Sequence, residues 1–178
     1  MEPTTLGDDR IRLRRWSYDD LGCIEEAGRD PVIPTSTTVP SPFSETEGRA
    51  FVERQWGRAA SGEGISLAIT DTKLGTAAGL VCLMHRQQPG VVGLGYWIVA
   101  PRRRHGLARR SVELLTRWAL LQVSVDRIEA LVEPDNRGSI RVLVTAGFHL
   151  EGILRGYFDF HEPRSDALLY SLISTDVS

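Results

Sequence analysis

Residues 91–110 constrain the fold of this 178-residue chain more than any other stretch. The apolar run 91–100 predicts a strand, which Pro101 should end because proline has no N–H for a ladder. A basic turn containing Gly106 follows, and apolar periodicity over 107–123 predicts a helix. A strand that passes through a glycine turn into a helix points backbone N–H groups at an anion, often a phosphate.

The composition is that of an ordinary globular protein, with 42% hydrophobic and 25% charged residues. The length suits a single domain, residues 1–178, with a core of about residues 10–173. A net charge of −2 provides no global attraction for nucleic acid or membranes, so any anion site must be local. We see no leader pattern, no apolar run of membrane-spanning length, and no cysteine pattern typical of disulfides or zinc. We therefore expect a cytoplasmic monomer or homodimer that binds no metal.

Periodicity and turn residues divide the chain into alternating elements. Strands are predicted at 10–15, 65–71, 77–86, 91–100, 126–133, 148–160 and 166–174, and helices at 19–28, 44–61, 107–123 and from Asn136 to about Gly147. Four prolines within residues 31–43 predict a loop without a helix.

The order β-α-α-β-β-β-α-β-α-β-β predicts the fold class. Residues 91–133 form a βαβ unit, so their two strands should be parallel. The other strands follow one another through short turns and should pair antiparallel. We expect an α/β protein of the α+β type, with a mixed, mostly antiparallel sheet around one central parallel pair.

The basic turn has the residues of a phosphate site. Gly106 lets the backbone approach a ligand, and Ala108 is small enough not to block it. Arginines at 102–104 add phosphate donors. The spacing matches neither the dinucleotide-binding G-x-G-x-x-G nor a P-loop, and a solvated basic turn before a helix is the alternative.

Two further pairs of residues are candidates for chemistry. Gly93 and Gly95 share one side of their strand, which indicates either a bulge or space for a ligand laid along it. Asn136 and Ser139 share one face at a helix start. Asn136 is expected as the N-cap, and a hydroxyl at Ser139 can either satisfy the backbone or donate a proton to a leaving group.

These motifs resemble a known family. The strand, Arg103-x-x-Gly106-x-Ala108 and the following helix resemble the acyl-CoA motif of the GNAT acetyltransferase superfamily. Other segments resemble its Rim-type ribosomal-protein alanine N-acetyltransferases, over about residues 10–173: Gly95-Tyr96-Trp97-Ile98, Asn136-Arg137-Gly138-Ser139, Ala146-Gly147-Phe148, and Glu151-Gly152 with Arg155.

The resemblance implies acetyl transfer from acetyl-CoA to a primary amine, and within this branch to a protein or peptide N-terminus. Ile98 and Val99 would hold the thioester and pantetheine arm between splayed parallel strands, and Asn136 would contact the cofactor. Ser139 would protonate the departing thiolate. The pyrophosphate would lie on the turn residues Arg103, Arg104, His105, Gly106, Leu107 and Ala108.

One position departs from the family pattern. The alanine N-acetyltransferases have a glutamate two residues before Gly-Tyr-Trp that helps to deprotonate the amine, and Gly93 stands there in this chain. Glu133, Glu63 or His85 could replace it, or water could suffice for an α-amine, whose pKa is near ~7.7–8.

Two alternative functions stay open because the acceptor is not specified by these motifs. One is acetylation of a small molecule, such as an aminoglycoside, another antibiotic or an amino acid. The other is a non-catalytic acyl-CoA-binding module, which the missing glutamate favours. Residues 31–43 and 155–164 are expected to rim the acceptor cleft, and an acidic cleft would favour polycationic acceptors.

Overall fold

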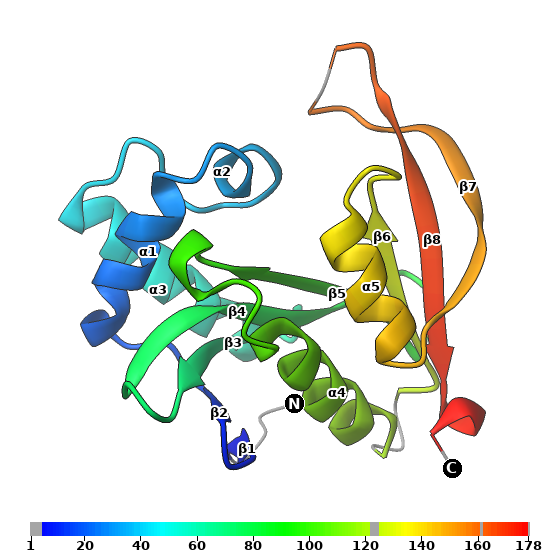
Figure 1. Ribbon diagram of the computed structural model, residues 1–178, viewed down its shortest axis with the longest axis horizontal. Coiled ribbons are helices and arrows are strands. Elements are labelled where there is room, and N and C mark those ends of the chain that lie inside the picture. The colour runs from blue at the N-terminus through cyan, green and yellow to red at the C-terminus, as the bar shows by residue number, and fades with distance from the viewer. Residues whose placement is uncertain (1–4, 122–124, 161, 178) are drawn as a thin grey trace. The chain divides into compact units, whose positions relative to one another are not determined.

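A computed structural model describes residues 5–121, 125–160 and 162–177 (Figure 1). Its strands are β1 (Leu6–Gly7), β2 (Ile11–Arg14), β3 (Gly64–Asp71), β4 (Thr76–His85), β5 (Val91–Ile98), β6 (Arg127–Val132), β7 (His149–Phe158) and β8 (Ser165–Ile173). Its α-helices are α1 (Leu21–Gly28), α2 (Ile33–Ser36), α3 (Glu45–Ala60), α4 (Leu107–Leu120) and α5 (Arg137–Thr145). Short 3-10 helices are η1 (Tyr18–Asp20), η2 (Ala100–Arg102) and η3 (Ser174–Asp176). Within the described ranges, no helix has both the length and the apolar character needed to cross a membrane.

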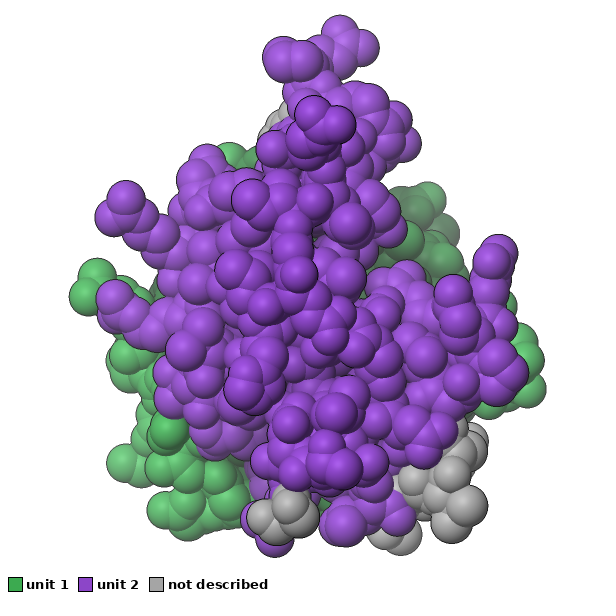
Figure 2. All heavy atoms as spheres, turned by 90° about the vertical axis from the view of Figure 1, so that its right-hand side faces the viewer, with its two compact units in different colours: residues 1–83, 95–111 green, residues 84–94, 112–178 purple. Residues whose placement is uncertain are grey.

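The chain forms two compact units, coloured separately in Figure 2. The first comprises Met1–Leu83 and Gly95–Ser111, and the second comprises Met84–Leu94 and Val112–Ser178. Strands β4 and β5 and helix α4 each contribute residues to both units.

The first unit is built on strands in the order β1-β2-β3-β4-β5. Strands β1, β2 and β3 pair antiparallel, with Leu6 opposite Leu13 and Ile11 opposite Asp71. Ile11 and Leu13 are fully buried, as their alternation with arginine predicts. The largest buried side chains are aromatic: Trp16 packs edge-on against Phe51 of α3, with ring centroids 5.5 Å apart.

The second unit continues with strands in the order β5-β6-β8-β7. Strands β5 and β6 run parallel from Val91↔Arg127 to Gly93↔Glu129, whereas β6–β8 and β8–β7 are antiparallel. Alternate β6 residues, Ile128, Ala130 and Val132, are buried, so Arg127 and Glu129 lie on the opposite face. Helix α5 lies beside β6 (Figure 1).

The structure confirms the predicted fold class: a mixed, mostly antiparallel sheet with one parallel pair. The helix signals are also confirmed. Ser44 caps α3 by accepting from the Glu47 N–H (3.2 Å), and Asn136 caps α5. Gly147 follows α5 with φ +88°, the left-handed conformation expected just after a helix. The predicted end of the helix at residue 123 lies outside the described residues, and α4 is assigned to Leu120.

Some local predictions were wrong. Residues 31–43 contain the short helix α2, because Pro34 lies in its first turn, where no N–H donor is required. The strand predicted over 91–100 ends at Ile98, and Pro101 lies in the 3-10 turn η2 for the same reason. Helical spacing in α5 also predicts Leu143 and Val144 on its apolar side, but only Leu143 is buried and Val144 is 57% exposed. Strand β1 was not predicted, because two residues carry no periodic signal.

Candidate functional site

The predicted phosphate turn lies in the first unit, between β5 and α4. Ile98 and Val99 are buried, and the Val99 N–H donates to the Ala78 carbonyl (3.0 Å). The chain then turns through η2 and two left-handed residues, Arg104 (φ +66°) and Gly106 (φ +77°). Such a conformation favours glycine and costs other residues about 1 kcal/mol or more, so Arg104 is held in a strained turn.

Helix α4 begins without an acidic residue in its first turn. Its first backbone bond runs from the Arg110 N–H to the Gly106 carbonyl (3.1 Å). The N–H groups of Leu107 and Ala108 therefore precede the hydrogen-bonded ladder, and with the helix dipole they favour an anion. Space is open above Gly106: a Cβ there would meet no atom within 4 Å. Leu107 is buried, so its backbone is the part that can serve a ligand.

Arg103, expected at the pyrophosphate, also binds groups of the protein. Its Nε donates to the Ile98 carbonyl (2.9 Å), and its Nη2 donates to Oδ2 of Asp30 (2.6 Å). The Asp30 side chain is only 3% exposed, whereas that of Arg103 is 45% exposed. Burial would raise the pKa of Asp30, but the Val32 and Ile33 N–H groups and the Arg103 guanidinium together hold it below its ordinary value. Arg103 thus stabilises the turn through Nε and Nη2, and only its remaining N–H donors can bind a ligand.

The remaining turn residues face solvent. Arg104 and His105 are exposed, and Ala108 is half-buried at the first turn of α4. The His105 Nδ1 lies 3.4 Å from the Arg102 carbonyl. An exposed cationic turn before a helix start can bind a phosphate or pyrophosphate group.

The second predicted cluster lies at the start of α5, in the second unit. The Asn136 side chain accepts a hydrogen bond from the Ser139 N–H (3.1 Å), which confirms its capping role. The Asn136 N–H donates to the Glu133 carbonyl (3.0 Å). Two hydrogen bonds to Asn136 therefore hold Glu133 and Ser139 close to each other at the start of α5.

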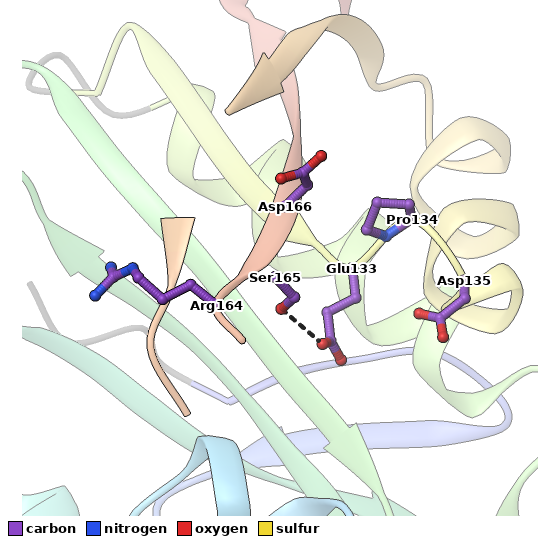
Figure 3. A pocket seen from close by; sticks show the side chains of 6 residues that line it. All are labelled: Glu133, Pro134, Asp135, Arg164, Ser165 and Asp166. Atoms are coloured by element: carbon purple, nitrogen blue, oxygen red, sulfur yellow. Dashed lines mark hydrogen bonds between the residues drawn. The ribbon is translucent and has the colours of Figure 1, made fainter. Parts of the chain in front are cut away.

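A pocket of about 570 Å³ lies beside this turn (Figure 3). Three of its six lining residues are acidic: the lining consists of Glu133, Pro134, Asp135, Arg164, Ser165 and Asp166. The Ser165 hydroxyl donates to Glu133 (3.3 Å), and the two side chains point toward each other in Figure 3. The Arg164 guanidinium extends away from Glu133 and bonds the Gly156 and Tyr157 carbonyls (2.7 and 2.8 Å). The half-buried Glu133 carboxylate can thus receive a cation or a proton.

The other proposed bases are less suitably placed. Glu63 is exposed in the turn before β3, and His85 is exposed at the end of β4. Neither lines the pocket described above. Of the three candidates, Glu133 is the one that lines this pocket.

The space beside Gly93 and Gly95 holds protein atoms, contrary to the expectation of a ligand there. A Cβ on Gly93 would fall 2.4 Å from Nη2 of Arg86, and one on Gly95 would fall 3.0 Å from the Cys82 sulfur. The Arg86 guanidinium therefore occupies the place of a side chain at position 93.

Sequence reasoning missed Asp30, the buried partner of Arg103, and the pocket residues Ser165 and Asp166 at the start of β8. An acidic residue just before a proline-rich loop gave no periodic signal. Arg164 falls in the predicted cleft rim 155–164, which was the available hint for the pocket. In the described part of the chain, no three His, Cys, Asp or Glu side chains gather as metal ligands would.

Comparisons with known proteins show the family and the fold of the chain. A family model for the acetyltransferase (GNAT) domain matches residues 10–149. The uncharacterized N-acetyltransferase p20 of Bacillus licheniformis is 26% identical over 177 residues, which cover 97% of each chain. The structure of Mycobacterium smegmatis RimJ in complex with CoA-disulfide is similar at a TM-score of 0.85 and 23% identity, covering 98% of this chain and 90% of that one. The microcin C7 self-immunity acetyltransferase MccE, in complex with acetyl-CoA and AMP, is similar at a TM-score of 0.80 and 18% identity, covering 93% of each.

Proposed function

Because the chain belongs to the GNAT acetyltransferase family, we propose that it moves the acetyl group of acetyl-CoA to the N-terminal amine of a protein or peptide. The structure of the start of α4 is the observation that supports acetyl-CoA as the donor. A left-handed turn at Gly106 presents unpaired N–H groups without an acidic residue nearby in the helix, which suits a pyrophosphate. The RimJ and MccE structures with coenzyme A compounds support this choice of donor.

We assign the donor contacts residue by residue. The backbone of Ile98 and Val99 contacts the thioester and the pantetheine arm. The Val99 N–H is not one of these contacts, because it already donates to the Ala78 carbonyl. The side-chain NH₂ group of Asn136 contacts the donor while the side-chain oxygen caps α5. The pyrophosphate is held by residues of the turn: Arg103, Arg104, His105, Gly106, Leu107 and Ala108.

The start of α5 supplies the proton transfers. Glu133 takes a proton from the acceptor ammonium, and the neutral nitrogen then attacks the thioester carbonyl carbon. The C–S bond breaks, the Ser139 hydroxyl gives its proton to the sulfur, and the proton lost from the new amide nitrogen restores the hydroxyl. The hydrogen-bonded turn that joins Glu133, Asn136 and Ser139 supports these roles.

A second candidate acceptor is a small polycationic amine. The carboxylates of Glu133, Asp135 and Asp166 around the pocket favour such a ligand, as expected for an acidic cleft. MccE, a structural neighbour, is named as a microcin C7 self-immunity acetyltransferase. The two acceptor classes differ in charge, which allows an assay to separate them.

The test has two stages. Calorimetry with acetyl-CoA should give saturable binding, and its absence at millimolar donor would contradict the donor half. A thiol-release assay should then be run over N-terminal peptides, polyamines and aminoglycosides. Turnover with peptides confirms the proposal, turnover restricted to polyamines or aminoglycosides supports the second candidate, and binding without turnover indicates a non-catalytic module.

A further inference from the structure

The Arg86 guanidinium lies directly over the backbone of Gly93. Three of its atoms, Nη2, Cζ and Nε, would lie 2.4–2.7 Å from a Cβ at that position. Gly93 is buried, whereas Arg86 is exposed, so the guanidinium covers the strand with one side and meets solvent with the other. The Arg86 N–H bonds the Val91 carbonyl (3.0 Å), which fixes the start of this side chain at the β4–β5 turn.

Neighbouring charges on this face are already paired. Glu129, in register with Gly93 on β6, accepts from Nε of Arg127 (2.9 Å). Glu151 accepts from Arg127 and from Ser171 (2.7 Å). Among the described residues, no side chain forms an ion pair with Arg86. Its planar set of donors therefore remains available for a carboxylate or phosphate.

Strand alternation places Arg86 and the Glu133 pocket on the same face of the sheet in the second unit. Residues in register on parallel neighbours share a face, so Gly93 with its covering guanidinium lies on the Glu129 face. Glu133 follows Glu129 by four residues, and alternation places it on the same face. Four residues of strand span ~13 Å. One face of the second unit thus presents a carboxylate pocket and, about that far away, an unpaired guanidinium.

We propose that Arg86 is a specificity-determining residue that binds an anionic group of the acceptor. This inference rests on the proposed acetyl transfer and on Glu133 as the place of the amine. The acceptor is then a zwitterion: its amine reaches the Glu133 pocket, and its carboxylate or phosphate reaches Arg86. An extended peptide covers ~13 Å in about four residues, so an acidic side chain near the fourth position fits. A purely cationic acceptor would meet the Arg86 charge with repulsion.

The test compares matched acceptors with the full-length enzyme. Short alanine-rich peptides with amidated C-termini carry aspartate at each position from the second to the sixth in turn, and a parallel set carries phosphoserine. The ratio of kcat/KM for the acidic peptide to that for the all-alanine peptide should reach about tenfold at the best position. The two sets distinguish a carboxylate from a phosphate as the preferred group.

Variants of Arg86 then test the assignment. Arg86→Gln should bring the ratio near one, Arg86→Lys should restore part of it, and Arg86→Glu should favour lysine at the same position. Arg141→Gln, which removes an exposed arginine of α5, should keep the wild-type ratio. Unchanged KM for acetyl-CoA and unchanged Tm show that the variants are folded.

Three outcomes would overturn the inference. A wild-type enzyme that acetylates neutral and acidic peptides equally would contradict it while leaving the proposed function intact. An Arg86→Gln enzyme that keeps the acidic preference would assign that preference to another residue. Failure of the wild type to acetylate any amine would remove the proposed function and this inference together.

Discussion

Two helix starts in this molecule have the same local plan and opposite electrostatics. Each follows a strand end through a tight turn: β5 leads to α4, and β6 leads to α5. At α4 the turn is basic, and it uses left-handed backbone at Arg104 and Gly106. At α5 the preceding residues include Glu133 and Asp135, and the Asn136 side chain caps the helix.

The difference shows how a helix start is assigned to a ligand. An N-cap side chain occupies one of the N–H donors that an anion would use, and carboxylates nearby repel the anion. The start of α4 follows Gly106, which has no side chain to cap the helix, and the nearby carboxylates of Asp30 and Asp8 are paired with arginines, so this start suits a pyrophosphate. The start of α5 has both features, which disfavours an anion there and is consistent with the proton-transfer roles proposed for Ser139 and Glu133.

Removing the hydroxyl at the start of α5 should have the largest effect. Ser139→Ala is expected to lower kcat about 100-fold, because the leaving thiolate loses its proton donor. Calorimetry should show that affinity for acetyl-CoA changes little. Ser61→Ala, at the exposed end of α3, is the matched control. An unchanged turnover for Ser139→Ala would remove this residue from the mechanism.

The Glu133 carboxylate is the next feature to test. Glu133→Gln should lower kcat/KM for an N-terminal peptide about tenfold near pH 8, where the α-amine is already partly neutral. At lower pH the loss should grow, since the variant depends on the neutral fraction of the amine, which falls about tenfold for each pH unit.

A pH–rate profile on each enzyme checks this difference. Asp135→Asn, which removes a neighbouring carboxylate of the same pocket, serves as the control. Parallel profiles for wild type and Glu133→Gln would show that Glu133 is not the base.

At α4, the left-handed turn can be altered without filling any space. Gly106→Ala should weaken acetyl-CoA binding about fivefold, because alanine resists φ +77° by about 1 kcal/mol and the turn relaxes. Calorimetric Kd values measure the effect. Gly57→Ala, where a Cβ also meets nothing within 4 Å but lies inside α3, should leave the Kd unchanged and raise Tm slightly. Equal Kd values for wild type and Gly106→Ala would contradict the assigned role of the turn.

The smallest effect concerns the ion pair that braces the turn. Asp30→Asn should lower the free energy of unfolding at pH 7 by about 1 kcal/mol, a modest value because the Arg103 guanidinium is half exposed. Since the folded-state pKa of Asp30 lies below its ordinary value, its stabilisation is present above about pH 4 and is lost as pH falls further.

Urea unfolding of wild type and variant across this pH range measures the difference. The two free energies should converge toward low pH, and Asp9→Asn, at an 87% exposed carboxylate, should show a smaller difference throughout. A difference between wild type and Asp30→Asn that does not depend on pH would contradict the assigned charge interaction.

Much of the fold could be predicted because its signals are local. The strand predicted at 126–133 shows its alternation as alternate burial in β6, and the predicted helix ends at Ser44, Asn136 and Gly147 depend on bonds or φ angles within a few residues. The short helix α2 was not predicted, because the prolines in and around it indicate a loop more strongly than four residues can indicate a helix. Hydrophobic periodicity does not show whether a proline lies in the first turn of a helix, where it is tolerated, or in the interior, where it breaks the helix.

The sequence by itself determined the order of elements, the parallel pair, the basic glycine turn and the family resemblance, since each depends on spacing along the chain. Only the tertiary structure decided what those residues touch. Arg103 meets Asp30 from 73 residues away, Ser165 meets Glu133 from 32 residues away, and Arg86 fills the place of the side chain missing at Gly93. Such contacts depend on strand register and on side chains reaching across turns, which no local pattern encodes. The turn between β5 and α4 could therefore be proposed as an anion site from the sequence, whereas the position of the Arg86 guanidinium over Gly93 could not be predicted.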